Sequence, residues 1–224
     1  MPEIAEPWTL GPVVVTGGTG HVGMAIARAF LAAGATTIAI GSNPQRTEAA
    51  GAELAAHGKA HVIAADISEP GNVPLVLDDI EQRFGTPAVL VNGAGINFQR
   101  LIRDLTSDEF DLIFKVNVKS MLFMSREACE RMGRAQIRGR VVNITSGNYR
   151  YARPDAALYS ASKAAMEMLT RGLALEYGHS GIAINAVAPG LVDRPGATDP
   201  AFLKVADYYR GQSANHVLAT PEAV

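Results

Sequence analysis

The sequence contains a tyrosine and a lysine whose spacing could support proton transfer. Tyr159 and Lys163 are four residues apart, which places both side chains on one face of a helix. An isolated phenol has a pKa of about 10, so lowering it by ~3 units requires ~4 kcal/mol. An ammonium ~4 Å away supplies about that much at an effective dielectric constant of ~20. Taken alone, the pair is more typical of an ordinary solvated helix face, so the rest of the chain has to overturn that interpretation.

Composition and charge narrow the classes of protein to which the chain can belong. Its 224 residues, 48% of them apolar, are enough to bury a core, and we expect a single domain over residues 1–224. Twenty Lys and Arg against 22 Asp and Glu give a formal net charge of −2, with no basic run that would follow a nucleic acid or an anionic membrane. We therefore expect no nucleic-acid partner, no membrane partner and no metal site.

The N-terminal residues and the cysteine content bear on the compartment. Residues 1–7 are acidic and contain two prolines, so they lack the basic and apolar regions of a secretory signal. No apolar run is long enough to span a bilayer. A single cysteine, Cys129, excludes an internal disulfide and fits a reducing environment. We expect a cytoplasmic protein.

Short runs rich in Val, Ile and Ala alternate with longer helical patterns from Pro12 to Ala188. This alternation predicts an α/β fold in which parallel strands are joined by right-handed helical crossovers. The expected strands are 12–16, 36–40, 60–65, 88–92, 139–145 and 182–187. The expected helices lie near 21–33, 44–57, 72–84, 107–132 and 156–178.

Local signals mark where helices begin and where regular structure stops. Thr106 and Glu109 have the spacing of a capping box, and Asp155, directly after Pro154, is a candidate cap for the helix that carries Tyr159. Prolines and glycines interrupt the apolar residues after residue 193. We expect a core over 12–190, followed by a mobile substrate flap and tail over 191–224.

A glycine-rich turn follows the first expected strand. Gly18, Gly20 and Gly23 form a Gly-x-Gly-x-x-Gly pattern between that strand and a helical segment that continues from Met24. Glycines allow a tight turn and a close approach of the backbone to pyrophosphate, whose charge is stabilised by free amides at the start of a helix. In this context of strand, turn and helix, the pattern predicts a dinucleotide site.

The end of the second expected strand bears on the choice of dinucleotide. NAD-binding folds usually place a carboxylate there to bind the 2′-hydroxyl of adenosine, but this strand is followed by Ser42 and Asn43. Together with Arg46, these residues offer donors that suit a 2′-phosphate. The sequence therefore favours NADP(H), with NAD(H) as the alternative cofactor. Asn43 and Pro44 fit a simple turn and helix start equally well.

Together these motifs resemble the short-chain dehydrogenase/reductase family over about Val13 to Gly190. The resemblance rests, in chain order, on Thr16-Gly17-Gly18-Thr19-Gly20-His21-Val22-Gly23, Asp66-Ile67, Asn92-Gly93-Ala94-Gly95, Asn117, Ser146, Tyr159 with Lys163, and Pro189-Gly190. It implies a single Rossmann-like, doubly wound parallel sheet with strand order 3-2-1-4-5-6 and helices on both faces. It also implies a catalytic tetrad formed by Asn117, Ser146, Tyr159 and Lys163.

The resemblance gives each tetrad residue a role that its chemistry supports. Hydride transfer belongs to a nicotinamide, and Tyr159 would give or take the proton of the substrate oxygen. Ser146 would donate a hydrogen bond to the charge that develops on that oxygen. Lys163 would stabilise the phenolate and bind the nicotinamide ribose, while Asn117 would hold a water that leads protons toward the lysine. Taken singly, Ser146 is also a turn residue and Asn117 a helix-packing amide.

Further positions correspond to cofactor contacts in the family. The glycine-rich turn would bind the pyrophosphate, the residues after the third and fourth strands would contact the adenosine, and the loop after the sixth strand would pass the nicotinamide. The implied contacts are Gly17, Thr19, Gly20, His21, Val22, Gly23, Asp66, Ile67, Asn92, Ala94, Gly95, Pro189, Gly190 and Val192, together with Tyr159 and Lys163. The same residues also fit ordinary strand ends and turns.

Two residues depart from the family pattern. His21 stands where the ordinary branch has a glycine, and we expect a slightly shifted cofactor, an imidazole contact to the pyrophosphate, or a histidine that faces solvent. Arg194 stands where the family often has a threonine that meets the nicotinamide carboxamide. An arginine at this position suits an anionic group, and it equally suits a flap side chain in water.

The family's last strand has no counterpart in the sequence, which ends at Val224. We therefore expect the sixth strand to be a sheet edge with unpaired backbone groups. The helices 107–132 and 156–178 correspond to those that pair subunits in the family, so a homodimer is expected, and tetramer contacts through a further strand are left open. A natural variant and a truncated product are alternative explanations.

The sequence thus predicts an NADP(H)-preferring oxidoreductase that acts on a small-molecule carbonyl or secondary alcohol, similar to the 3-oxoacyl-carrier-protein reductases. The substrate pocket is expected to be lined by residues 97–99, 148–153 and 191–215. The aromatic side chains of these segments favour apolar or ring-bearing ligands; they are Tyr149, Tyr151, Phe202 and Tyr208. Two alternatives remain, a catalytically impaired nucleotide-binding regulator or scaffold, and a non-redox epimerase or lyase on the same fold. Net cofactor turnover separates both from a dehydrogenase.

Overall fold

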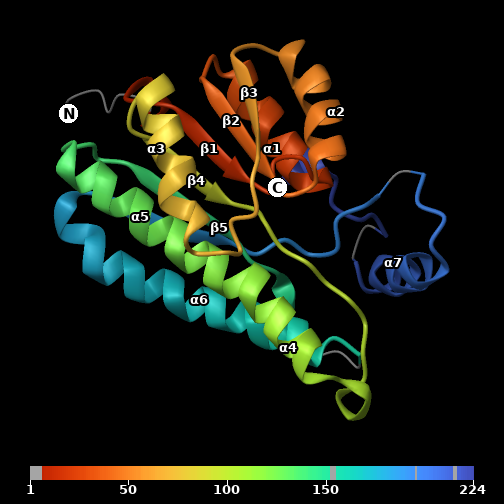
Figure 1. Cartoon of the computed structure of the whole chain (residues 1–224). Helices are drawn as coiled ribbons and strands as arrows, with labels where there is room; N and C mark the ends of the chain where they lie inside the picture. Colours follow the sequence, from red (N-terminus) through yellow and green to blue (C-terminus); the bar gives the residue numbers. More distant parts are fainter. Residues whose placement is uncertain (1–6, 152–154, 195, 214–215) are drawn as a thin grey trace.

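The computed structural model describes residues 7–151, 155–194, 196–213 and 216–224. One sheet of six parallel strands forms the centre of the molecule, in the order β3-β2-β1-β4-β5-β6 (Figure 1). The strands are β1 (Val13–Thr16), β2 (Thr37–Gly41), β3 (Ala60–Ala64), β4 (Val89–Asn92), β5 (Arg140–Ile144) and β6 (Ala183–Val187). The predicted strand order is confirmed, and each predicted strand is present to within one residue at either end.

Helices cover both faces of the sheet because the central strands are apolar on both sides. Val14 of β1 packs into one core, whereas its neighbours Val13 and Val15 pack into the opposite one. The first core lies against α3 (Asn72–Phe84), α5 (Ser120–Arg134) and α6 (Ala157–Tyr177). The other face carries α1 (His21–Ala32) and α2 (Pro44–Ala55). This layering is that of a doubly wound sheet.

The helix predicted over 107–132 is a continuous helical run with three parts. The first, α4 (Ser107–Ile113), begins with the predicted capping box, in which the side chains of Thr106 and Glu109 each accept from the other's backbone amide. It passes into a π-helical turn, η3 (Phe114–Lys119), and then into α5. Such turns often mark functional sites, and Asn117 lies within this one.

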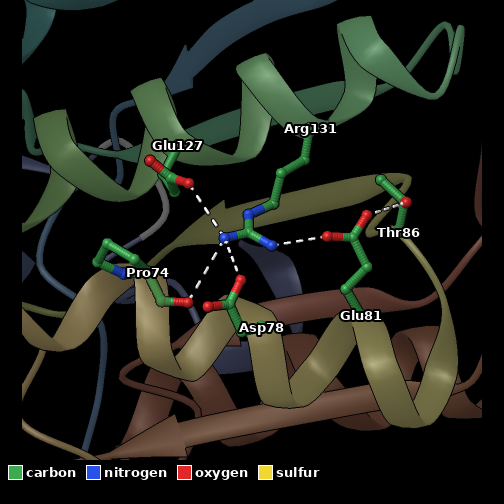
Figure 2. Close-up of polar contacts among 6 residues, drawn as sticks. All are labelled: Pro74, Asp78, Glu81, Thr86, Glu127 and Arg131. Carbon is green, nitrogen blue, oxygen red and sulfur yellow. Dashed lines mark hydrogen bonds and ion pairs between the residues drawn. The ribbon is translucent and has the colours of Figure 1, made fainter.

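A buried arginine ties α5 to α3. The Arg131 side chain is almost inaccessible, and its guanidinium donates to Glu81 at 2.6 Å, Asp78 at 2.7 Å and Glu127 at 3.1 Å (Figure 2). Glu81 accepts a further short hydrogen bond from the Thr86 hydroxyl. Burial works to lower the pKa of Arg131, but its hydrogen bonds to the carboxylates raise that pKa by more. The cation is thus compensated where it is buried.

The segment after β6 contains a helix that the sequence analysis did not predict. α7 (Pro200–Gln212) packs through Phe202 and Ala206 onto Leu218, which forms a small apolar cluster of its own. Val192 forms a parallel bridge with Ala219, and the chain then ends near α1 in the short turn η6 (Pro221–Ala223). Figure 1 shows this segment, in blue, beside the carboxyl ends of the strands.

Other 3₁₀ turns join the main elements. They are η1 (Pro7–Thr9), η2 (Ile102–Asp104), η4 (Gly147–Tyr149) and η5 (Gly178–Ser180). The sheet formed by the described residues ends at β6, which pairs with β5 alone. In the described ranges, no helix combines the length and the apolar character that a membrane span requires.

The predicted cap at Asp155 is wrong. The residue that precedes α6 is Ala156, and no side chain caps this helix. Asp155 instead has a left-handed backbone, with φ of 64°. Its carbonyl accepts from the Arg100 amide at 2.7 Å, so this residue shapes the loop that leads into α6 rather than the helix end itself.

Candidate active site

The candidate site lies where the carboxyl ends of the central strands meet. Thr16 of β1 pairs with Asn92 of β4, and the Thr16 carbonyl and hydroxyl accept from the amides of Gly93 and Ala94. On the other side, the Gly147 amide donates to the Pro189 carbonyl at 2.9 Å. These bonds gather the loops after β1, β4, β5 and β6 at one edge of the sheet, the edge at which doubly wound folds bind ligands.

The glycine-rich turn is packed too closely for side chains. Gly17 has a left-handed backbone with φ of 66°, and a β-carbon at Gly23 would lie 2.2 Å from the Gly17 carbonyl oxygen. A β-carbon at Gly18 would lie 2.7 Å from the Ala39 side chain. Gly20 precedes α1, and no side chain caps the first amides of that helix. The turn therefore fits a bound pyrophosphate, since these amides are available to an anion.

Lys163 is a buried cation without a carboxylate partner among the described residues. Its side chain lies in the interior, and Nζ donates to the Ile144 carbonyl at 2.9 Å. Burial lowers the pKa of Lys163 to about 8. An ammonium has three donors, and the Ile144 bond is the one that the described residues accept. The remaining donors are available to acceptors from a ligand.

Tyr159 and Ser146 line the same cavity at the mouth of this site. The Lys163 ammonium lies 5.7 Å from the centroid of the Tyr159 ring, as the spacing on α6 predicted. Ser146 Oγ accepts from the Asn148 amide at 3.3 Å, and no described residue accepts the proton of its hydroxyl. The structure therefore brings a phenol, a free hydroxyl donor and a buried ammonium together.

Asn117 is completely buried and is linked to the loop after β4. Its side-chain amide accepts from the Ile96 amide at 2.8 Å and donates to the Ile96 carbonyl at 3.0 Å. A β-carbon at Gly95 would lie 3.3 Å from Asn117 Oδ1 and 3.6 Å from Lys163 Nζ. Asn117, Gly95 and Lys163 are thus neighbours, although each comes from a different element.

Sequence reasoning missed Ser162, which connects Asn117 to the Tyr159 turn. Its hydroxyl donates to the Tyr159 carbonyl at 2.7 Å and accepts from Asn117 Nδ2 at 3.0 Å. Ser162 is fully buried. Its position directly before Lys163 was a usable signal, because a polar side chain on the inward face of an amphipathic helix needs a partner.

The residues expected at the adenosine ribose lie at the end of β2. Asn43 caps α2 by accepting from the Arg46 amide at 2.9 Å, so the helix-start interpretation of this residue is confirmed. Ser42 and Arg46 are exposed, and the Arg46 guanidinium donates to the Thr19 carbonyl at 3.3 Å. Arg46 therefore lies beside the glycine-rich turn, where a 2′-phosphate would require a cation.

The predicted adenine contacts divide into surface and interior positions. Asp66 is exposed, and its carboxylate accepts from the Ser68 amide and hydroxyl. The side chain of Ile67 packs into the main core. Asn92 is also buried and donates to Ser125 and Asn143, so its side chain faces the interior rather than the site.

The loop after β6 closes toward the glycine-rich turn. His21 is exposed, as the solvent-facing alternative expected, and its Nε2 also contacts the Asp193 carbonyl oxygen at 2.8 Å. Val22 follows His21 and Val192 precedes Asp193, and both are half-buried. The Pro189 carbonyl accepts from the Gly147 amide, as described above. His21 thus connects the start of α1 to the segment after β6.

A cavity of about 1460 Å³ opens beside Tyr159 and Ser146. Its wall includes the predicted residues 97–99 and residues of the predicted flap, but Tyr149 is not part of it. The predicted residues 152 and 153 lie outside the described residues. The lining consists of Asn97, Phe98, Gln99, Ser146, Gly147, Asn148, Tyr151, Tyr159, Gly190, Leu191, Val192, Arg194, Asp199, Phe202, Val205, Tyr208, Tyr209 and Gln212.

Comparison with known proteins agrees with this geometry. The family model described as short chain dehydrogenase matches residues 12–202. A 3beta-hydroxysteroid dehydrogenase from Mediterraneibacter gnavus is 33% identical over 185 residues, which are 82% of this chain and 66% of that protein. A D-beta-hydroxybutyrate dehydrogenase from Rhizobium meliloti is also 33% identical over 185 residues, 81% of this chain and 71% of that protein.

A solved structure described as a candidate gluconate dehydrogenase from Agrobacterium tumefaciens has the same fold. It superposes with a TM-score of 0.86 at 27% sequence identity. The match covers 94% of this chain and 84% of that one.

Proposed function

Because the chain belongs to the short-chain dehydrogenase family, we propose that it is an NADP(H)-preferring oxidoreductase that interconverts a ketone and a secondary alcohol, with Tyr159 as the general acid and base. The family is one of oxidoreductases that use NAD or NADP. A bound nicotinamide supplies or accepts the hydride. The residues of the chain position the substrate oxygen and move its proton.

The observation that carries the proposal is the environment of Lys163. The ammonium is buried, has no carboxylate partner among the described residues and lies 5.7 Å from the Tyr159 ring centroid. A positive charge in this position favours the phenolate over the phenol, and low local polarity strengthens the effect. An ordinary structural lysine would reach water or an acid.

Tyr159 and Ser146 act on the same oxygen in this scheme. In the direction of reduction, the Tyr159 hydroxyl donates its proton to the substrate oxygen, and the Ser146 hydroxyl donates a hydrogen bond to the charge that develops there. In the direction of oxidation, the phenolate removes the proton from the alcohol. The Asn148 amide holds Ser146 Oγ as an acceptor, so its proton is directed to another acceptor.

Lys163 would stabilise the charge of Tyr159, and Asn117 would fix its position. The donors of Lys163 that no described residue accepts are available to the phenolate and to ribose hydroxyls. A phenolate or ribose hydroxyl that accepts from Nζ would stabilise the protonated form of Lys163, which burial disfavours. Asn117 fixes the loop at Ile96 and, through Ser162, the turn of α6 that carries Tyr159.

Arg46 supports the choice of NADP(H). It is exposed beside the Thr19 carbonyl, and residues 42–46 contain no carboxylate that would repel a 2′-phosphate. Replacing Arg46 with Ala should weaken NADPH binding about tenfold and leave NADH binding unchanged, because one charge-assisted contact is lost. Arg28→Ala, which removes a half-buried arginine of α1 that pairs with Glu53, is the matched control. Equal losses for both cofactors would contradict the preference.

The relatives support a secondary alcohol as the substrate. Those named above include dehydrogenases of a hydroxysteroid and of hydroxybutyrate, and the cavity beside Tyr159 is large enough to hold a small organic molecule. We propose the same class of reaction for this chain.

The decisive experiment is steady-state oxidation of NADPH and NADH with a panel of ketones. Tyr159→Phe should lower kcat/KM between about a hundredfold and ten-thousandfold, the range that a general acid contributes. Cofactor binding, measured by fluorescence titration, should persist in the variant.

Tyr177→Phe is the matched control for this experiment. It removes the same hydroxyl from the same helix, but Tyr177 donates to Glu130 and lies outside the cavity. Its activity should equal that of the unchanged protein. Full activity of Tyr159→Phe, or the absence of turnover from a folded protein that binds cofactor, would refute the proposed function.

A further inference from the structure

We propose that Arg194 binds a carboxylate of the substrate, so that the preferred substrates join an apolar, ring-bearing body to an anionic end. This inference rests on the proposed function, because it specifies the substrate class of the same cavity. It concerns a residue that lies in the cavity wall and takes no part in the proton transfer described above.

Arg194 places a positive charge in the cavity wall. Among the lining residues that the structure describes, it is the one Lys or Arg, and Asp199 is the one carboxylate. The contact of the Arg194 guanidinium within the described residues is with the Phe202 ring. A guanidinium remains protonated throughout the working pH range of enzymes. Its charge is therefore available to a ligand.

A neighbouring arginine shows what a structural arginine does in this region. Arg210 of α7 pairs with Asp193 at 3.4 Å and with Asp207 at 3.1 Å. Its charge is thus compensated by the flap itself. Arg194 is one residue from Asp193, but only its backbone amide donates to that carboxylate. The flap accordingly holds one arginine by ion pairs and leaves the other with an aromatic partner.

The aromatic partner orients the Arg194 guanidinium. Its central carbon lies 4.1 Å from the centroid of the Phe202 ring, and Phe202 is itself buried in the cluster beneath α7. Contact with an aromatic face holds the plane of the guanidinium while its edge donors stay free. Two parallel donors on one edge match the two oxygens of a carboxylate.

The other residues of the cavity wall indicate the size and polarity of the rest of the ligand. Phe98, Val205, Tyr208 and Tyr209 give the cavity apolar and aromatic surface, and its volume of about 1460 Å³ exceeds that of a small hydroxy acid. Tyr159 and Ser146 belong to the same cavity as Arg194, so one molecule can reach both. A ring-bearing keto acid combines the required groups.

The bound anion could also come from a phosphate of the cofactor, and the experiment has to separate these two sources. The probes are three phenyl keto acids with two, three or four methylene groups between the carbonyl and the carboxylate, each paired with its primary amide. An acid and its amide have nearly the same shape but differ in charge. Their ratio of kcat/KM therefore isolates the anion site.

We expect the best acid to exceed its amide in kcat/KM by about ten- to hundredfold, the value of one charge-assisted bidentate contact. Arg194→Met keeps an unbranched stem over Phe202 and should reduce this ratio to about one by slowing the acid alone. Arg194→Lys should retain an intermediate ratio, because it keeps the charge but loses the fork. Arg83→Met, which removes an arginine stacked on Phe84 of α3, should leave the ratio unchanged.

Two results would overturn the inference while the proposed function stands. One is turnover of the acids and the amides with equal kcat/KM in the unchanged protein. The other is an Arg194→Met variant that keeps the acid preference and binds NADPH more weakly in the absence of substrate. That result would mean that Arg194 binds a phosphate of the cofactor.

Calorimetric titration of the acids and amides into the protein with NADP⁺ tests the site independently of turnover. If no ketone is reduced, tighter binding of an acid than of its amide, abolished in Arg194→Met, would still support the anion site. Equal binding of both would refute it.

Discussion

Two cations are buried to the same extent in this molecule, and they differ in what surrounds them. Arg131 and Lys163 each have 5% of their surface exposed. Arg131 lies among Asp78, Glu81 and Glu127, as Figure 2 shows, whereas Lys163 donates to a single backbone carbonyl. The pKa of Arg131 is raised by these carboxylates despite burial, while burial alone lowers the pKa of Lys163 to about 8.

The presence or absence of neighbouring carboxylates distinguishes a cation that stabilises the fold from one whose charge is available for a reaction. The charge of Arg131 is neutralised by the fold, so it can hold α3 against α5 but has little left to offer a ligand. The charge of Lys163 is left for acceptors that enter the site. A buried cation that lacks an anion destabilises the empty protein, and such strain is expected where a ligand restores the balance.

The largest expected effect is on activity when Lys163 is replaced. Lys163→Met should lower kcat by about a thousandfold, because the ~4 kcal/mol that the ammonium contributes to the phenolate is lost. The variant should unfold at the same denaturant concentration as the unchanged protein or a higher one, since an uncompensated buried charge is removed. Kinetics and urea titration measure the two effects. A stable variant with full activity would end the distinction between the two cations.

The opposite result is expected for Arg131. Arg131→Met should lower the free energy of unfolding by about 3 kcal/mol, because it leaves partly buried carboxylates without their cation. The kcat of the folded fraction should not change. Arg134→Met, on the same helix but exposed, should change stability by no more than about 0.5 kcal/mol. A loss of activity without a loss of stability would contradict the structural role.

The pH dependence of stability gives a third and smaller test. The usual pKa of lysine is 10.5, and that of folded Lys163 is about 8, so between these values the unfolded chain binds more protons. The stability contributed by this group therefore rises with pH, by about 2 kcal/mol from pH 7.5 to pH 9.5. Lys163→Met should lack this rise.

The measurement is a urea titration of both proteins at the two pH values. The thiol of Cys129, whose pKa burial raises to about 12, acts in the opposite direction above pH 9, and it cancels because both proteins contain it. Parallel pH profiles for the two proteins would mean that Lys163 titrates normally.

The smallest effect is expected when one carboxylate of the Arg131 cluster is neutralised. The Asp78 side chain is 64% exposed, and two other carboxylates remain beside the guanidinium. Asp78→Asn should therefore lower the free energy of unfolding by less than about 1 kcal/mol. Urea titration at low and at high salt checks this value. A loss as large as that of Arg131→Met would mean that the cluster depends on one pair.

Much of the fold followed from the sequence because its signals are local. The alternation of apolar runs and helical patterns predicted all six strands, and Thr106 with Glu109 predicted the start of α4. Asp155 misled because a capping residue can equally adopt a left-handed turn, and the difference depends on a contact with Arg100 far away in the sequence. α7 was missed because Pro200 and Gly211 at its ends read as loop signals.

The candidate site was predictable to the extent that it depends on spacing. Tyr159 and Lys163 share a helix face, and the strand before Gly17 with the helix after Gly20 predicted a turn that fits a phosphate. Asn92 shows the limit. Its place after a strand suggested a contact with the cofactor, but a polar residue at a strand end can turn either way, and the buried partners Ser125 and Asn143 draw it inward.

By itself the sequence determined which elements form, their order and which residue types lie one helical turn apart, because backbone preference and side-chain periodicity are set by near neighbours. Only the tertiary structure decided which charges are compensated. The carboxylates around Arg131, the solitary carbonyl at Lys163 and the aromatic ring beneath Arg194 are brought there by packing between segments. Burial and charge pairing arise between residues distant in the chain, and they distinguish a cation whose charge the fold compensates from one whose charge it leaves uncompensated.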